Sequence, residues 1–140
     1  MTSFKFLDHT GDAMFRARGS TLEEAIRSAA LAVASLIWDG TPVGEPETRK
    51  VSLEGRSLEQ LVVRALDEIV YLEETEGFLL SDVEGIRLGG TDGRLSLEAV
   101  FVGEQITDRH GLRGGVKAVT YNQLMIERDD GVTIQVVVDV

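Results

Sequence analysis

Residues 4–18 read Phe-Lys-Phe-Leu-Asp-His-Thr-Gly-Asp-Ala-Met-Phe-Arg-Ala-Arg. An apolar run at 4–7 and a second run at 13–18 flank a polar segment at 8–12. Apolar and basic side chains alternate along the second run, which is typical of a half-buried β-strand, and the first run indicates a short strand. The polar segment holds two carboxylates, an imidazole and a hydroxyl. This density of polar groups favours a functional role in addition to a turn.

The end of the chain is the second unusual stretch. A strongly apolar run at 132–138 stops at Asp139 and Val140. If the fold lays this run beside Asp12, the two aspartates and the main-chain carboxylate of Val140 converge. Such a cluster repels itself unless a hard cation or a bound proton neutralises it. We therefore hypothesise a divalent-metal site made by Asp12, Asp139 and Val140, and oxygen-only ligands favour calcium, magnesium or manganese over zinc.

Each of these residues also has a structural interpretation. Asp8 and Thr10 can bond to nearby backbone amides in a turn, with His9 as a structural side chain. Asp139 can be a solvated acid near the chain end. Lys117 lies on a late apolar strand, where it can pair with the acidic site or an anion, or simply face solvent on an edge strand.

The rest of the pattern predicts an α+β fold. Apolar residues recur at three- and four-residue steps after Ser20 and again after Ser57, and both serines begin segments with the spacing of a capping box. The first helix should end near Trp38 and the second at Gly77. Further strands are predicted at 48–53, 83–88, 95–101, 116–126 and 132–138. We expect a single domain over 1–140 with two layers, two helices on a mixed sheet, in the order β-β-α-β-α-β-β-β-β.

Composition narrows the possible partners. The chain has 140 residues, no cysteine and a formal net charge of −10. Such an acidic chain is repelled by phosphate backbones, which disfavours sequence-independent nucleic-acid binding. It can meet a basic protein face, or its acidity can serve solubility alone. Neither a membrane span nor a signal peptide is predicted, so we expect a cytoplasmic protein.

Motifs for catalysis are weak. The glycine-rich segment at 89–93 lacks the ending of a phosphate-binding loop, and 129–131 lacks the ligand spacing of an EF-hand. No nucleophile, base and orienting group can be assembled. A loop at 103–115 contributes most of the one basic cluster, which can touch RNA or a ligand phosphate or simply be solvated. Its members are Arg109, His110, Arg113 and Lys117.

Several segments taken in order resemble the archease family. These are Phe-Leu-Asp-His-Thr-Gly-Asp at 6–12, Thr-Leu-Glu-Glu-Ala at 21–25, Lys-Ala-Val-Thr-Tyr at 117–121 and Asp-Val at 139–140. The stretch at 58–80, with Tyr-Leu followed by Glu-Gly, is also similar. The likeness is spread along the chain, and the segments together are more specific than any one alone.

The resemblance implies a small α+β protein that assists the tRNA-splicing RNA ligase, an enzyme that joins RNA ends through a guanylylated histidine. In that family the archease is not the ligase; it speeds guanylylation and lets the ligase turn over repeatedly. We therefore expect a non-catalytic protein cofactor that binds a divalent metal ion, most simply calcium. Its partner would be the RNA-splicing ligase, and it would meet RNA only indirectly, through the ligase.

The resemblance also implies roles for particular residues. The family's metal-binding aspartate falls on Asp12, its terminal pair on Asp139 and Val140, and its functionally important lysine on Lys117. The chain departs from the family at two positions. Gly11 replaces an alanine, which changes backbone freedom more than chemistry. A histidine is replaced by Asn122, which leaves open any part of that imidazole in metal binding or proton transfer.

Two other function classes remain possible at this level. One is a small metal-dependent phosphoester hydrolase that uses the same acids as ligands and His9 as base. The other is an acidic interaction module without a metal. Hydrolysis by the purified protein alone would favour the first, and an absence of calcium or magnesium binding would favour the second.

Overall fold

The computed structural model describes residues 3–7 and 11–140. Its elements follow the predicted order. Their bounds are β1 (Ser3–Leu7), β2 (Ala13–Gly19), α1 (Leu22–Ile37), β3 (Glu47–Gly55), α2 (Leu58–Glu76), β4 (Phe78–Thr91), β5 (Arg94–Gln105), β6 (Ala118–Arg128) and β7 (Val132–Asp139). The predicted α+β class is confirmed. Among the described residues, no helix is long and apolar enough to cross a membrane.

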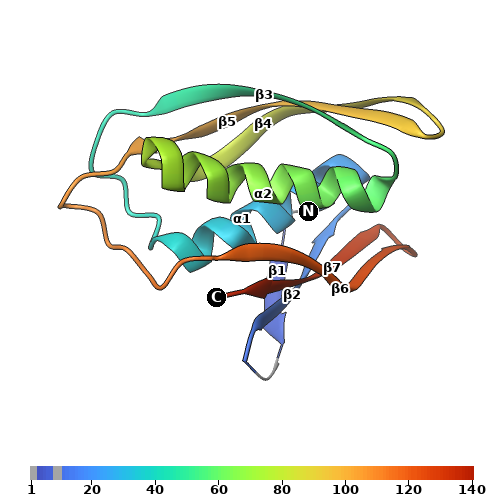
Figure 1. The fold of residues 1–140 in the computed structure, drawn as a ribbon, viewed down its shortest axis with the longest axis horizontal. Coiled ribbons are helices and arrows are strands. Elements are labelled where there is room, and N and C mark those ends of the chain that lie inside the picture. Colours follow the sequence, from blue (N-terminus) through green and yellow to red (C-terminus); the bar gives the residue numbers. More distant parts are fainter. Residues whose placement is uncertain (1–2, 8–10) are drawn as a thin grey trace.

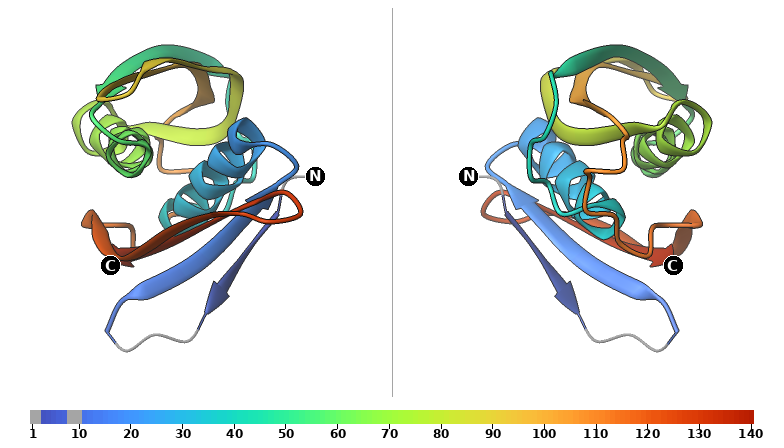
Figure 2. Two further views of the ribbon diagram at one scale, coloured as in Figure 1. Left: turned by 90° about the vertical axis from the view of Figure 1, so that its right-hand side faces the viewer. Right: turned by 90° about the vertical axis from the view of Figure 1, so that its left-hand side faces the viewer.

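The two helices lie between two sheets (Figures 1 and 2). One sheet has the strand order β1-β2-β7-β6 and the other β3-β5-β4, and every pairing in the described part of the chain is antiparallel. This division into two sheets is finer than the single two-layer arrangement that the sequence led us to expect. Periodicity shows which residues of a strand are buried, but it does not show which strands pair.

Capping side chains explain where the helices begin. Ser57 caps α2 by accepting a hydrogen bond from the Gln60 amide at 3.1 Å, as its spacing predicts. For α1 the cap is Thr21, one residue later than the predicted Ser20, and it accepts from the Glu24 amide at 3.2 Å. Serine and threonine are adjacent there, and both can cap a helix, so sequence alone did not separate them.

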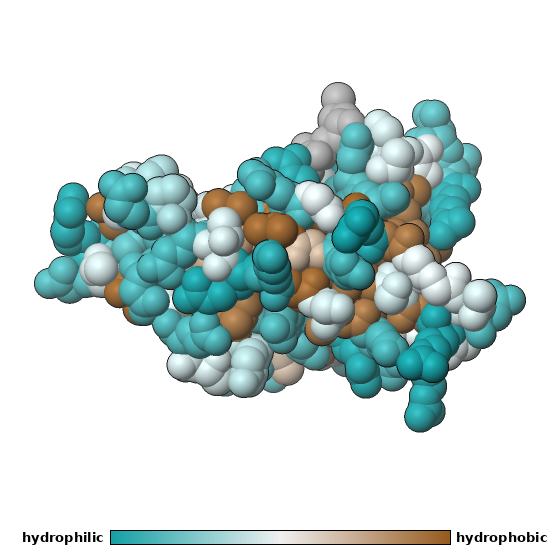
Figure 3. Space-filling view, turned by 90° about the horizontal axis from the view of Figure 1, so that it is seen from above, coloured by the Kyte–Doolittle hydropathy of each residue, from teal (hydrophilic) through white to brown (hydrophobic). Residues whose placement is uncertain are grey.

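The β4–β5 hairpin is longer than predicted. β4 and β5 both extend well beyond the predicted strands at 83–88 and 95–101. Register shifts between Leu80 and Asp82 and between Glu84 and Arg87 interrupt the regular pairing. Such irregularities break the two-residue alternation that identifies a strand in sequence. The outer face of this sheet, seen from above in Figure 3, carries mostly hydrophilic side chains with apolar patches among them.

The core lies between the layers, and β7 is its most buried strand. All seven residues from Val132 to Val138 are buried, because β7 is flanked by β2 and β6 within its sheet. The inward side chains of β2, Phe15 and Ala17, are fully buried. Because β7 runs antiparallel to both neighbours, its last residues lie beside the first residues of β2 and β6.

Candidate functional site

Three parts of the chain that are distant in sequence meet at one end of the four-stranded sheet. In the β2–β7 ladder Ala13 pairs with Val138, so residue 12 directly precedes a position bonded to the end of β7. In the β6–β7 ladder Ala118 pairs with Asp139. The Lys117 amide donates to the Asp139 carbonyl oxygen at 2.7 Å. Residues 12 and 117 therefore lie on either side of Asp139, and Figure 2 shows the C-terminus near the start of β2.

The alternation of side chains along β2 and β7 shows toward which face of the sheet Asp139 points. Phe15 and Ala17 face the helices, and Ala13 and Val138 share their side of the sheet. Because successive side chains of a strand point to opposite faces, Asp139 takes the outer face. Asp12 is half-buried, whereas Asp139 and Lys117 are exposed. The site is thus open to solvent and to a partner.

The donor set at this end consists of hard oxygen atoms. Val140, which follows Asp139, is 44% exposed. Among the residues that the structure describes, no three His, Cys, Asp or Glu side chains gather closely enough to hold a metal ion. The two aspartates together with main-chain oxygens of Val140 are compatible with the ligands of calcium, magnesium or manganese. Asp8 and His9, which belong to the polar segment with a predicted functional role, lie outside the described residues.

The loop before Lys117 is held by the end of α1. The amides of Arg113 and Gly115 donate to the carbonyl oxygens of Ile37 and Leu36 at 2.8 and 3.0 Å. The last carbonyls of a helix have no partner within the helix, so these loop amides satisfy them. The Arg113 guanidinium donates to the Ser35 carbonyl at 3.1 Å, where the helix dipole favours a cation. This loop therefore reaches Lys117 along a defined path.

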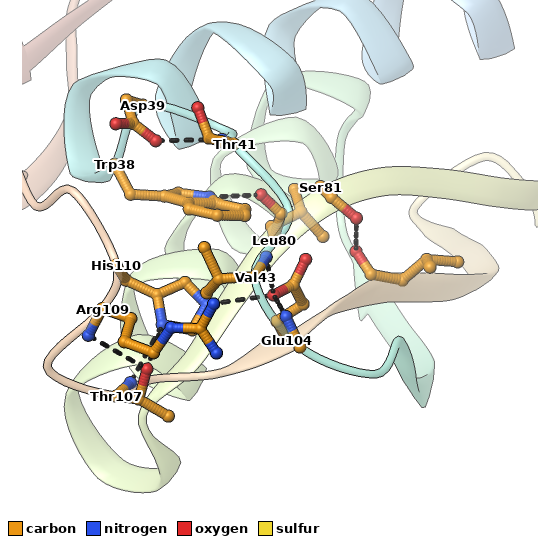
Figure 4. Close-up of polar contacts among 12 residues, drawn as sticks. Trp38, Asp39, Thr41, Val43, Leu80, Ser81, Glu104, Thr107, Arg109 and His110 are labelled. Atoms are coloured by element: carbon orange, nitrogen blue, oxygen red, sulfur yellow. Dashed lines mark hydrogen bonds and ion pairs between the residues drawn. The ribbon is translucent and has the colours of Figure 1, made fainter.

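A buried carboxylate fixes the start of the same loop (Figure 4). Glu104 Oε1 accepts the amides of Val43 and Gly44 at 3.0 and 2.8 Å and lies 3.0 Å from His110 Nε2. Burial raises the pKa of Glu104, but the hydrogen bonds from Val43, His110 and Gly44 outweigh it, so the pKa lies below its ordinary value. The group is consequently an ionised acceptor at neutral pH.

His110 is oriented by both of its ring nitrogens. The Thr107 amide donates to Nδ1 at 3.0 Å, so this nitrogen carries no proton. Nε2 therefore carries the proton and donates to Glu104. The ring also packs edge-on against Trp38 with centroids 5.4 Å apart, and the indole donates to the Leu80 carbonyl at 2.7 Å.

This geometry corrects the interpretation of the basic cluster. His110 is buried with both ring nitrogens hydrogen-bonded, so it belongs neither to a solvated loop nor to an RNA-contacting surface. The Glu104–His110 pair is enclosed by loops and has a structural role. Sequence reasoning missed Glu104, because its amide partners lie 60 and 61 residues away and no periodic pattern marks them.

Helix α2 holds the strand that follows Lys117. Asp67 Oδ1 accepts the Val119 amide at 3.3 Å, and burial raises the pKa of this carboxyl group. Beyond Thr120 the register with β7 is interrupted up to Met125. Asn122, the position where the resemblance implied a histidine, lies in this irregular segment and is exposed. It is therefore outside the regular part of the ladder, in which Ala118 pairs with Asp139.

A comparison with models of protein families matches residues 4–140 to the Archease protein family. The chain belongs to the archease family. Protein archease of Methanosarcina acetivorans is 38% identical over 139 residues, which cover 98% of this chain and 95% of that relative. Protein archease of Methanothermobacter thermautotrophicus is 35% identical over 131 residues, covering 94% and 93% of the two chains.

The fold of this archease-family chain also matches a solved structure. The solution structure of a Methanobacterium thermoautotrophicum protein superposes with a TM-score of 0.80 at 31% sequence identity, over 98% of both chains. The resemblance found in the sequence is thus confirmed along its whole length. The curated relatives bear the name "Protein archease", which names no reaction.

Proposed function

We propose that this protein is a non-catalytic activator of an RNA-splicing ligase and that it binds a divalent cation, calcium in the first instance. The observation that carries the proposal is the meeting of Asp12, Lys117 and Asp139 at one exposed sheet end in an archease-family chain. The ligase is the direct partner. In this role the protein promotes guanylylation of the ligase histidine and repeated rounds of RNA joining.

The aspartates of the sheet end would hold the metal. Asp12 and Asp139, with main-chain oxygens of Val140, supply hard ligands from two strands, and their mutual repulsion falls when a cation is bound. A bound cation supplies charge neutralisation for phosphate oxygens. Lys117 adds a positive charge beside the pair. The backbone bond from Lys117 to Asp139 fixes the main chains of these two residues relative to each other.

The experiment is ligase turnover with GTP and a broken RNA substrate, with and without this protein. Asp12→Ala and Asp139→Ala should each lower the stimulation at least roughly tenfold, since each removes a charged ligand. Asp92→Ala, an exposed acid in the β4–β5 turn, is a charge-matched control and should stimulate fully. Full stimulation by both site variants would contradict the proposal.

The purified protein should not hydrolyse phosphoesters alone. Of the two histidines, His9 lies outside the described residues, and the ring of His110 is enclosed and bonded at both nitrogens, which leaves it unsuited to act as a base. Hydrolysis without the ligase that disappears in Asp12→Ala would instead favour a metal-dependent hydrolase.

A further inference from the structure

Basic side chains lie on the outer face of the four-stranded sheet, away from its acidic end. Lys5 of β1 pairs with Arg16 of β2, and Ser3 pairs with Arg18. Arg16 and Arg18 alternate with the inward Phe15 and therefore share the outer face with Lys5. Since residues two apart on a strand lie about 6.6 Å apart, the three cations form a compact group. We call Lys5, Arg16 and Arg18 the basic face.

Two adjoining depressions surround this basic face. One, of about 400 Å³, is lined by Ser3, Phe4, Lys5, Arg16, Arg18 and Thr133. The other, of about 350 Å³, continues past Ser3 and Arg18 to the turn that connects β6 to β7. Because both depressions share Ser3 and Arg18, they form one elongated hollow. Its shape suits an extended ligand better than a compact one.

The two arginines are held in place by neutral acceptors. Arg18 donates to Thr133 Oγ1 at 2.7 Å and to the Asp130 carbonyl at 3.1 Å. Arg16 Nε donates to Gln135 Oε1 at 2.9 Å, and the Gln135 amide donates in turn to the Gln123 carbonyl. These bonds fix the guanidinium groups without neutralising them. An arginine ordered before binding loses less side-chain entropy when an anion arrives.

This arrangement differs from that of two arginines in the other sheet. Arg87 and Arg94 of the β4–β5 hairpin pair with Glu98 and Glu54 at 2.9 and 3.3 Å. In the described part of the chain, neither Arg16 nor Arg18 forms an ion pair. Asp130 is the one acid among the described residues that line the hollow. The hollow is thus locally positive in a chain with 24 acidic and 14 basic residues.

We propose that this basic face binds the sugar–phosphate backbone of single-stranded RNA directly. Three cations along an elongated hollow match a linear polyanion, and fixed guanidinium groups bind phosphate oxygens well. Arginine recognises phosphate groups through its planar fork of N–H donors, so two fixed arginines on one face favour a phosphate backbone. The net charge led us to expect contact with RNA only through the ligase. Net charge does not show how the basic residues are distributed over the surface.

The test measures binding of a fluorescent single-stranded RNA to the purified full chain by anisotropy, without ligase. We expect weak binding on the order of 10⁻⁴ M at low salt. With three phosphate contacts, the logarithm of the binding constant should fall against the logarithm of salt concentration with a slope of about −2. The double variant Arg16→Gln/Arg18→Gln should bind at least roughly tenfold more weakly, with a slope near −0.7.

Matched variants make the result decisive. Arg87→Gln/Arg94→Gln changes the net charge by the same amount on the other sheet and should bind RNA like the unchanged protein. Lys5→Gln, at an exposed position, should weaken binding even if the double variant folds poorly. RNA binding that is absent, or that these basic-face changes leave unaltered, would overturn the proposal. Equal affinity for poly-glutamate of matched length would overturn the assignment to RNA. All of these measurements are made without ligase, so their outcomes are independent of whether the protein stimulates the ligase.

Discussion

The exposed end of the four-stranded sheet and the buried Glu104–His110 pair use similar groups in opposite environments. At the sheet end, Asp139 and Lys117 face solvent. In the interior, one oxygen of Glu104 meets three donors, and both His110 nitrogens are bonded. Buried polar groups with full hydrogen bonding specify one conformation, whereas exposed charges add little stability and remain available to ligands. Burial, more than residue type, therefore distinguishes the charged groups that stabilise the fold from those that are available to a ligand.

The largest effect should follow the loss of the buried carboxylate. Glu104→Ala leaves the Val43 and Gly44 amides and the His110 ring without their acceptor, so the free energy of unfolding should fall by about 3–5 kcal/mol. Chemical denaturation measures this change. Glu98→Ala, in the same strand but paired with the exposed Arg87, is the control and should cost less than about 1 kcal/mol. A similar loss of unfolding free energy in Glu104→Ala and Glu98→Ala would contradict the distinction between buried and exposed charged groups.

The Glu104–His110 pair should also make the free energy of unfolding depend on pH. The folded pKa of Glu104 lies below its ordinary value of 4.5, so its stabilising contribution is present above about pH 4.5 and is lost as the pH falls through the folded pKa. The difference in unfolding free energy between the protein and Glu104→Gln should therefore shrink as the pH falls below about 4.5. Denaturation series between neutral and acidic pH test this, and a constant difference would contradict it.

An intermediate effect is expected where an ion pair is only half-buried. Arg27 of α1 donates to both carboxylate oxygens of Asp82 in β4, at 2.8 and 3.1 Å. Both side chains keep more than a third of their exposure, so Asp82→Asn should lower the unfolding free energy by only about 0.5–1 kcal/mol. A loss as large as that of Glu104→Ala would show that burial does not govern these contributions.

The smallest effect on stability is expected at the sheet end. Asp139→Asn keeps the size of an exposed side chain, so the unfolding free energy should change by less than about 0.5 kcal/mol. The same variant should nevertheless lose most of its stimulation of the ligase. Destabilisation by several kcal/mol would instead assign Asp139 to the structural class.

Local patterns predicted much of this fold. Ser57 and Gly77 delimit α2 as their chemistry requires, since serine caps an N-terminus and Gly77 adopts a φ of +65° at the other end. The pairing of β2 with β7 could not be derived in the same way. It joins residues more than a hundred positions apart, and periodicity carries no signal for such contacts.

Local patterns also predicted part of the candidate site. Asp12 and Asp139 attract attention because each lies where an apolar run starts or stops. The resemblance to the archease family linked them, whereas the residues alone offered only a conditional hypothesis. The anchoring of the loop by Glu104, and the basic face around Arg16 and Arg18, depend on which side chains the register brings together. Sequence patterns therefore did not reveal them.

The proposed function depends most on cation binding at the end of the four-stranded sheet. Its most direct test is a calorimetric titration of calcium into the protein and into Asp12→Asn and Asp139→Asn, with Asp92→Asn as the charge-matched control. We expect saturable binding of one calcium ion to the protein and to Asp92→Asn, and at least roughly tenfold weaker binding to each site variant. Equal calcium binding by all four proteins would contradict it, as would no binding by any of them at millimolar calcium.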